Sequence, residues 1–255
     1  MPAPPIVEFS AVTKRFGDGP LVLDRVNLTA QPGDFISLIG PSGCGKSTLL
    51  RLIAGLSPVT GGRLSVDGLT PEEAAAELAF VFQEPTLLPW LTVRRNVEVP
   101  QVLRGIPAGE IHATSRRVLD LVRLGDRGLA HPRQLSGGQK MRVSIARALS
   151  LSPKILLLDE PFGALDEMTR EHLNEELLAI REQQAWTGFF VTHSVAEAVF
   201  LSNRILVMSA SPGRFHTEIA VPFAYPRTEA TRLSRDYQEL VAEVSRLLRS
   251  VEPAN

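Results

Sequence analysis

The sequence predicts an α/β protein built around a parallel β-sheet. Three short apolar runs, at residues 35–39, 155–158 and 189–191, carry this prediction. Continuous apolar runs of this length are typical of strands that are buried on both faces of a parallel sheet. Ligands bind beyond the carboxyl ends of such strands, so the loops that follow these runs are the first candidates for a site. Helical patterns come after the three runs, at residues 46–56, 169–184 and 195–201.

Further patterns complete the predicted architecture. Residues from about 89 to 150 are helical in pattern and rich in arginine, and we expect them to form a helical subdomain. A C-terminal helix is expected at about 228–250, where an apolar stripe predicts packing on the core. The remaining predicted elements are strands at residues 7–16, 21–30, 63–67, 78–82, 205–208 and 216–221.

Composition narrows the class of protein. The chain has 255 residues, 44% of them hydrophobic, which is enough to bury a substantial core. The formal net charge of −1 does not favour nucleic acid, and no nucleic-acid partner is expected. The single cysteine, Cys44, excludes an intrachain disulfide and fits a reducing compartment. The sequence contains neither an apolar stretch long enough to span a bilayer nor an N-terminus like a signal peptide.

The loop after the first run has the composition of a phosphate-binding loop. Residues 40–48 read GPSGCGKST, which matches G-x-x-x-x-G-K-[S/T] between a predicted strand and a predicted helix. Glycine allows positive φ and a close approach of backbone N–H groups to phosphate oxygens. A lysine then supplies a charge for the β- and γ-phosphates, and a serine hydroxyl supplies a ligand for Mg²⁺. The predicted nucleotide contacts are Gly40, Pro41, Ser42, Gly43, Cys44, Gly45, Lys46, Ser47 and Thr48.

Two acidic residues follow the second run. Asp159 and Glu160 end the apolar segment 155–158, which is too apolar for a surface turn. Their position at a strand end directs Asp159 towards a bound metal and Glu160 towards the γ-phosphate. Glu160 is therefore the candidate base that accepts a proton from the attacking water. These two loops together predict binding and hydrolysis of a nucleoside triphosphate.

A third motif, LSGGQ at residues 135–139, precedes a predicted helix at about 139–149. Ser136 is the expected N-cap of that helix. The glycine N–H groups and the positive end of the helix dipole form a second anion site. One chain thus carries two phosphate-binding surfaces that are far apart in the sequence.

In this combination the motifs resemble those of the ATP-binding subunit of ABC transporters, over residues 7–221. The resemblance implies one ATPase domain over residues 1–251, with a RecA-like core, an antiparallel β subdomain and the helical subdomain inserted at about 89–150. Residues 40–48 are similar to the Walker A loop, 155–160 to the Walker B strand and 135–139 to the family signature. Gln83 resembles the glutamine of the family's Q-loop, and Asp166 resembles the aspartate of its D-loop. His193 resembles the switch histidine, and Phe16 stands where the family places an aromatic residue against adenine.

The resemblance also implies roles for these residues. Gln83 would contact Mg²⁺ and the attacking water, so Ser47, Gln83 and Asp159 form the expected metal set. Glu160, His193 and Gln83 form the expected catalytic set. Phe16 would stack on adenine, although it could instead be a core strand residue.

The separation of the two anion sites is resolved by the family's assembly. The resemblance implies a homodimer packed head to tail, in which each ATP lies between the Walker A loop of one subunit and the signature of the other. Ser136, Gly137, Gly138 and Gln139 would then hold the γ-phosphate of the partner's nucleotide. Closure that depends on this phosphate would relax after its cleavage, which converts hydrolysis into motion.

Three segments resemble one subgroup of this family. Residues 84–97, 161–166 and 211–214 are similar to the ATP-binding subunits of nitrate, sulfonate and taurine importers. This implies integral membrane permease subunits and, indirectly, an extracytoplasmic binding protein, with the chain peripheral on the cytoplasmic face of the cell membrane. Trp90 is expected either to line the groove for the permease or to be a core aromatic residue.

Other functions stay open at this level. The cargo could be another small solute, such as a pyrimidine vitamin precursor, because no residue of an ATP-binding subunit touches cargo. A soluble ABC ATPase outside transport is a second alternative, but the sequence has no long heptad segment between its motifs. A regulatory module without turnover is a third, and Lys46, Asp159, Glu160 and His193 argue against it.

Overall fold

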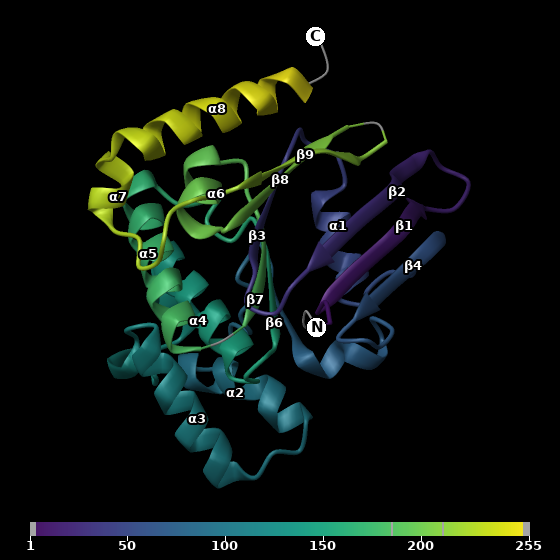
Figure 1. Cartoon of the computed structure of the whole chain (residues 1–255). Coiled ribbons are helices and arrows are strands. Elements are labelled where there is room, and N and C mark those ends of the chain that lie inside the picture. Colours follow the sequence, from purple (N-terminus) through teal and green to yellow (C-terminus); the bar gives the residue numbers. More distant parts are fainter. Residues whose placement is uncertain (1–3, 185, 211, 252–255) are drawn as a thin grey trace.

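Two sheets of unequal size organise the computed structural model, which describes residues 4–184, 186–210 and 212–251 (Figure 1). Residues 1–3 of the predicted domain and Ser211 of the predicted segment 211–214 lie outside the described residues. The larger sheet has six strands in the order β5-β6-β7-β3-β8-β9, and all neighbours are parallel except β8 and β9. Its strands are β3 (Phe35–Ile39), β5 (Leu78–Val81), β6 (Ile155–Asp159), β7 (Thr187–Val191), β8 (Arg204–Ser209) and β9 (Arg214–Ala220).

The predicted α/β class is confirmed, and each central strand is buried on both faces. In β3, Phe35 and Ile39 belong to one apolar cluster, whereas Ile36 and Leu38 belong to another. This period of two follows from the pleat of a strand, which turns successive side chains to opposite faces. The two clusters are the cores on the two sides of the sheet.

Helices cover one face of this sheet (Figure 1). Helix α4 contacts α5, α5 contacts α6 and α6 contacts α8, and residues of these helices and of α2 and α3 share one core cluster. No helix in the described ranges is both long enough and apolar enough to cross a membrane. The helices are α1 (Lys46–Ile53), α2 (Val93–Leu103), α3 (Ala108–Leu121), α4 (Gly137–Leu149), α5 (Glu167–Gln183), α6 (Val195–Leu201), α7 (Glu229–Leu233) and α8 (Arg235–Val251), with short 3₁₀ turns at Glu73–Glu77, Gly125–Arg127 and Pro132–Gln134.

A three-stranded antiparallel sheet covers the other face, with α1 beside it (Figure 1). Its order is β2-β1-β4, and its strands are β1 (Val7–Arg15), β2 (Leu21–Ala30) and β4 (Gly61–Val66). Alternating buried and exposed residues in β1 and β2 fit a sheet with one face on the core. The second apolar cluster fills the space between the two sheets and α1.

Several predicted boundaries are shifted by one to three residues, and two predicted helices differ most clearly from the structure. The helix predicted at 46–56 ends at Ile53, because the chain turns at Gly55, where φ is +66°. The helix predicted at 228–250 is divided at Ser234, whose ψ of 146° is extended, so it forms α7 and α8. This break turns Leu233 out of the predicted stripe, and its side chain is 75% exposed. The run 189–191 ends with β7, as predicted, and His193 lies two residues beyond it.

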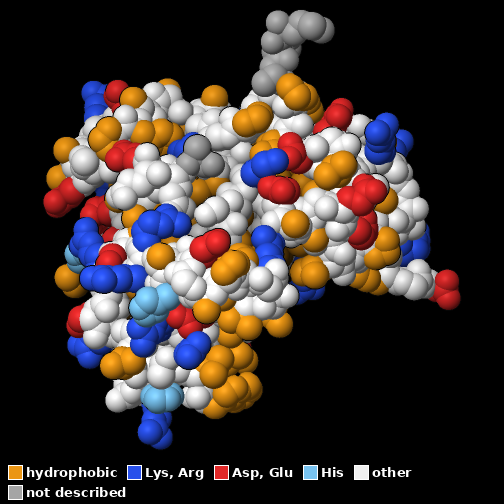
Figure 2. Space-filling view, turned by 90° about the horizontal axis from the view of Figure 1, so that it is seen from below, with side chains coloured by type: hydrophobic (Ala, Val, Ile, Leu, Met, Phe, Trp, Pro, Cys, Tyr) orange, Lys and Arg blue, Asp and Glu red, His pale blue; other side chains and the backbone are white. Residues whose placement is uncertain are grey.

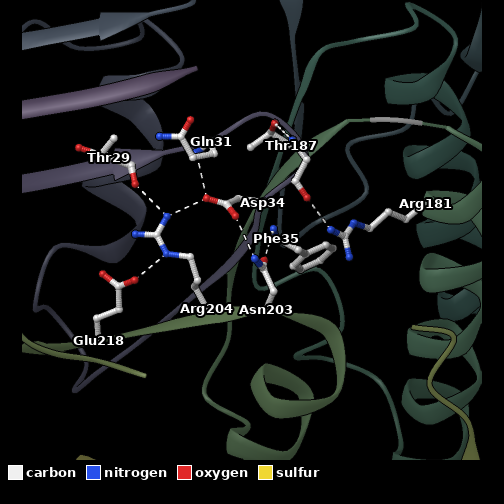
Figure 3. A network of polar contacts seen from close by, with 10 residues as sticks. Thr29, Gln31, Asp34, Phe35, Arg181, Thr187, Asn203, Arg204 and Glu218 are labelled. Atoms are coloured by element: carbon white, nitrogen blue, oxygen red, sulfur yellow. Dashed lines mark hydrogen bonds and ion pairs between the residues drawn. The ribbon is translucent and has the colours of Figure 1, made fainter. Parts of the chain in front are cut away.

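A polar network holds the start of β3 to its neighbours (Figure 3). The Arg204 guanidinium contacts Asp34 at 2.7 Å and Glu218 at 2.6 Å, and it donates a hydrogen bond to Thr29 O on β2. The Asn203 amide donates to Asp34 and accepts from the N–H of Phe35. Burial opposes ionisation of Asp34, but these hydrogen bonds and the Arg204 charge outweigh it and lower its pKa. The network links the two sheets at the start of β3, the strand that leads into the phosphate loop.

Candidate functional site

The predicted phosphate loop forms a cradle of free N–H groups. Within the described part of the chain, the N–H groups of Gly43, Gly45, Lys46 and Ser47 have no protein acceptor. They lie between the carboxyl end of β3 and the first turn of α1, where the helix dipole adds positive potential. Lys46 is buried, and its Nζ donates to Gly40 O at 2.8 Å and to Pro41 O at 3.0 Å. These features make the loop a receptor for phosphate oxygens.

At two positions of the loop, any side chain would clash with neighbouring atoms, so only glycine fits there. A Cβ on Gly45 would lie 2.6 Å from Leu23 Cδ2, and its φ is +99°. A Cβ on Gly40 would lie 2.6 Å from Met208 O and 2.9 Å from Cys44 Sγ. The loop therefore fits between β2 and β8 only without side chains at these positions.

The predicted metal ligands Ser47 and Asp159 lie together. Ser47 Oγ donates a hydrogen bond to Asp159 Oδ1 at 2.8 Å. Burial raises the pKa of Asp159, and the charge of Glu160 adds to this, while the Ser47 hydrogen bond, Arg51 and Lys46 oppose it. A half-buried carboxylate beside a hydroxyl fits Mg²⁺, which usually takes one or two protein ligands and completes its shell with phosphates and water. Within the described residues, no cluster of three His, Cys, Asp or Glu side chains offers a metal cage.

The predicted catalytic residues meet at Glu160. His193 Nε2 lies 2.7 Å from Glu160 Oε1, and Gln83 Nε2 lies 3.5 Å from Glu160 Oε2. The three residues come from the loops after β7, β6 and β5, which end at one edge of the sheet. Glu160 has a left-handed φ of +48°, held by a hydrogen bond from its N–H to Val191 O. Such strain in a non-glycine residue persists only where neighbours fix it, and it is common at active sites.

A cavity of about 250 Å³ joins the cradle to this catalytic group. Glu160 and His193 line the cavity together with residues of the phosphate loop, whereas Gln83 lines a second cavity that Glu160 and His193 also border. Val22 of β2 also lines it, which sequence reasoning missed because an apolar residue in an alternating strand carries no signal of its own. The lining residues from the predicted loop are Ser42, Gly43, Gly45, Lys46, Ser47 and Thr48.

A second group behind His193 was also missed. The Thr192 hydroxyl donates to the buried carboxylate of Glu197, and the N–H of Ser194 donates to Thr192 Oγ1. Arg170 Nε lies 3.7 Å from Glu197 Oε1 and connects the start of α5 to α6. These contacts fix the turn that carries His193. Only the spacing of Thr192 and Glu197 around a predicted helix start could have indicated them.

The signature and D-loop residues do not line this cavity. Ser136 is the N-cap of α4, as predicted, and its hydroxyl and the Gln139 side chain form a reciprocal capping box. Asp166 caps α5 by accepting the N–H of Thr169. The two helix starts are packed together, since a Cβ on Gly138 would lie 2.8 Å from Thr169 Cγ2 and one on Gly137 would lie 3.2 Å from Leu165 Cδ2. The signature therefore lies apart from the cavity beside the phosphate loop.

Three remaining predictions concern single side chains. Phe16 is 50% exposed in the turn after β1, with Lys14 Nζ 4.5 Å from its ring centroid, so it is not a core residue. Trp90 is 70% exposed, and the alternative of a core aromatic residue is wrong. Cys44 of the phosphate loop is buried, and burial raises the pKa of its thiol.

Comparison with known proteins identifies the family. The model of a family described as ABC transporter matches residues 23–163. The chain belongs to the ABC transporter family. It is an ATP-binding cassette that hydrolyses ATP. A Brucella abortus protein named as an ATP-binding protein is 46% identical over 91% of this chain and 89% of its own length. Aliphatic sulfonates import ATP-binding protein SsuB of Bacillus cereus is 44% identical over 88% and 86%, and SsuB of Bacillus subtilis is 43% identical over 82% and 81%.

Solved structures place the cassette among ABC proteins. A dimeric ATP-binding cassette in a post-hydrolysis state, bound to ADP and Pi, is 32% identical, with a TM-score of 0.75 over 86% of this chain and 100% of its own. The cassette cbiO1 of Clostridium perfringens has a TM-score of 0.81 over 98% of this chain and 100% of its own, at 23% identity, which supports the fold. The predicted ATP-binding family and fold class are thus confirmed.

Replacement of Gly45 tests the cradle directly. Gly45→Ala should weaken ATP binding about 5- to 150-fold, because a side chain at positive φ against Leu23 costs about 1–3 kcal/mol in the cradle geometry. A titration with a fluorescent ATP analogue measures the affinity. Gly109→Ala is the matched control, because no atom lies within 4 Å of its added Cβ. Unchanged affinity in folded Gly45→Ala would contradict the assigned geometry.

Proposed function

We propose that this chain is the energy-coupling ATPase subunit of a bacterial importer, with residues 1–251 acting as one ATPase domain and 89–150 as its helical subdomain. The observation that carries the proposal is the meeting of the phosphate loop, Glu160 and His193 around one cavity, with Asp159 hydrogen-bonded to Ser47 of that loop. The likeness to named import subunits over more than four fifths of the chain supports the importer role.

ATP binds with its phosphates in the cradle. The N–H groups of the loop and Lys46 hold the β- and γ-phosphates, and Ser47, Gln83 and Asp159 would hold Mg²⁺. When bound, Mg²⁺ neutralises developing negative charge on the phosphates. Phe16 offers its exposed ring to adenine.

Hydrolysis requires one proton acceptor. Glu160 accepts a proton from water as the water oxygen attacks the γ-phosphorus, and the bond to the ADP oxygen breaks. His193, which lies 2.7 Å from Glu160, orients the carboxylate and contacts the γ-phosphate. Gln83 positions the water from the opposite side of Glu160. The products are ADP, inorganic phosphate and one proton.

The second anion surface is used by a partner copy. In a head-to-tail homodimer, Ser136, Gly137, Gly138 and Gln139 hold the γ-phosphate of the ATP bound in the partner's cradle, and Asp166 lies beside it. Support comes from the separation of the signature from the cavity within one chain and from the dimeric cassette of similar fold. Loss of the γ-phosphate removes the ligand shared by both chains, so the dimer opens.

Membrane permease subunits on other chains are the proposed docking partners. The exposed apolar side chains of Trp90, Val102 and Leu103 lie on the helical subdomain, and Leu103 is 82% exposed. Figure 2 shows apolar side chains gathered at one edge of the face seen from below, beside a region rich in Lys and Arg. An exposed apolar group with a basic border fits a surface that meets another protein at the cytoplasmic side of the membrane. An extracytoplasmic binding protein would act through these permeases.

The proposed cargo is an aliphatic sulfonate, because the named relatives at 43–44% identity import aliphatic sulfonates. A nitrate-type anion or a pyrimidine vitamin precursor would use a similar ATPase. A role outside transport is disfavoured by the short helical segment, in which α2, α3 and α4 have 11, 14 and 13 residues and form no coiled-coil arm.

Mixed subunits test the shared site. Ser136→Arg and Lys46→Ala subunits are each expected to be inactive, since every composite site in either homodimer has one damaged half. In a mixed dimer, one of the two composite sites keeps both halves. The mixture should therefore recover ATPase activity above both single variants, measured by phosphate release. Lack of recovery, with both variants folded, would refute the head-to-tail assembly.

Cargo is tested by growth of a strain that lacks this gene. The strain should fail on an alkanesulfonate as the only sulfur source and grow normally on sulfate, because the importer would have no energy source. The wild-type gene should restore growth, whereas Glu160→Gln should not. Failure only on nitrate as nitrogen source would reassign the cargo, and normal growth on every source would contradict the importer role.

A further inference from the structure

Arg147 makes an unusual set of contacts at the end of the signature helix. It lies in the last turn of α4, and its guanidinium reaches the segment that follows Gln83. Arg147 Nη1 donates to Thr86 O at 2.9 Å, and Nη2 donates to Pro85 O at 2.8 Å and to Thr86 Oγ1 at 3.0 Å. The planar fork of the guanidinium thus holds two consecutive residues of this loop at once.

The charge of Arg147 is not used for an ion pair in the described residues. Its hydrogen-bond acceptors are backbone carbonyls and hydroxyls, and burial lowers its pKa because no carboxylate offsets the desolvation. Burial of a cation is unfavourable unless its donors are satisfied. The Arg147 guanidinium therefore donates almost all of its hydrogen bonds to Pro85 and Thr86. Its remaining acceptor is Ser144 Oγ at 3.5 Å.

The clamped loop is strained at the point of contact. Thr86 has a left-handed φ of +45°, which a β-branched residue rarely adopts without support. The next part of the segment has a separate support, because the buried Asn96 side chain donates to the carbonyls of Leu88, Leu91 and Thr92. Arg147 is thus the side chain that fixes the part of the loop nearest to Gln83.

We propose that Arg147 is a positioning residue for hydrolysis, which acts by holding Gln83 in reach of Glu160 and the attacking water. The inference rests on the proposed role of Gln83. Gln83 lies two residues before Pro85 and 3.5 Å from Glu160, so release of the clamp frees the amide from the catalytic group. A misplacement of about 1 Å can lower a rate by up to about 100-fold.

The position of Arg147 gives the clamp a second consequence. Helix α4 begins at the signature and is 13 residues long, or about 20 Å. The same rigid helix thus ends on the loop of its own chain's Gln83 and starts at the surface offered to the partner's nucleotide. A shift of the loop would displace the signature end as well.

The first experiment compares homodimers in which both subunits carry the same single substitution. Arg147→Ala should lower kcat about 10- to 100-fold and leave ATP affinity unchanged, because the cradle is intact. Arg147→Lys keeps the charge but loses the fork, so it should lie between Arg147→Ala and wild type; it also carries the test if the alanine variant does not fold. Arg116→Ala, an exposed arginine on α3, is the matched control and should equal wild type.

A double-mutant cycle shows whether Arg147 acts through Gln83. If it does, Gln83→Ala with Arg147→Ala should have the kcat of Gln83→Ala alone, within about twofold. Multiplied losses in the double variant, or a lowered ATP affinity with unchanged kcat, would overturn the proposal.

Mixed dimers show in which subunit Arg147 acts. Arg147→Ala should lower activity strongly when added to the Ser136→Arg subunit, which supplies Gln83 to the intact site. It should lower activity less when added to the Lys46→Ala subunit, which supplies only the signature to that site. Equal losses in both placements would refute a role through Gln83. If the mixture of Ser136→Arg and Lys46→Ala subunits is inactive, the proposed head-to-tail assembly fails. The double-mutant cycle of Gln83 and Arg147 in the homodimer still tests the role of Arg147.

Discussion

The site depends on the alignment of parallel strands in a sheet that is buried on both faces. Because β3, β6 and β7 are held in register, the phosphate loop, Asp159 and the turn with His193 emerge at the same edge. Register is set by apolar residues that must face one of two cores, and a slip by one residue would exchange the faces. The network of Arg204 and Asp34 adds a polar anchor at the other end of β3.

This constraint explains how much could be predicted from sequence. The runs 35–39 and 155–158 became β3 and β6 with boundaries almost unchanged, since continuous burial leaves a strong pattern. The break in the C-terminal helix at Ser234 and the exposure of Trp90 could not be predicted from the sequence, because each depends on which residues pack nearby in the fold. Glycine spacing identified the cradle, but the contact of His193 with Glu160 joins residues that only the sheet order brings together.

Contacts over long sequence separations also explain what was missed. Arg147 meets Thr86 across 61 residues, and neither residue has a pattern that indicates the other. The same applies to Val22 in the cavity wall. By contrast, the Ser136 cap was predictable because capping is local, within three residues. Local motifs therefore identified the pieces of the site, whereas their mutual geometry required the fold.

The central claim is that one ATP is held between two copies of the chain, by the cradle of one and the signature of the other. Sedimentation velocity of Glu160→Gln with ATP and Mg²⁺ tests it most directly, because this variant should bind ATP and not cleave it. The account predicts a stable dimer with two ATP molecules, which reverts to monomers when Ser136→Arg is added. A variant that binds ATP with full affinity and stays monomeric at every protein concentration would contradict it.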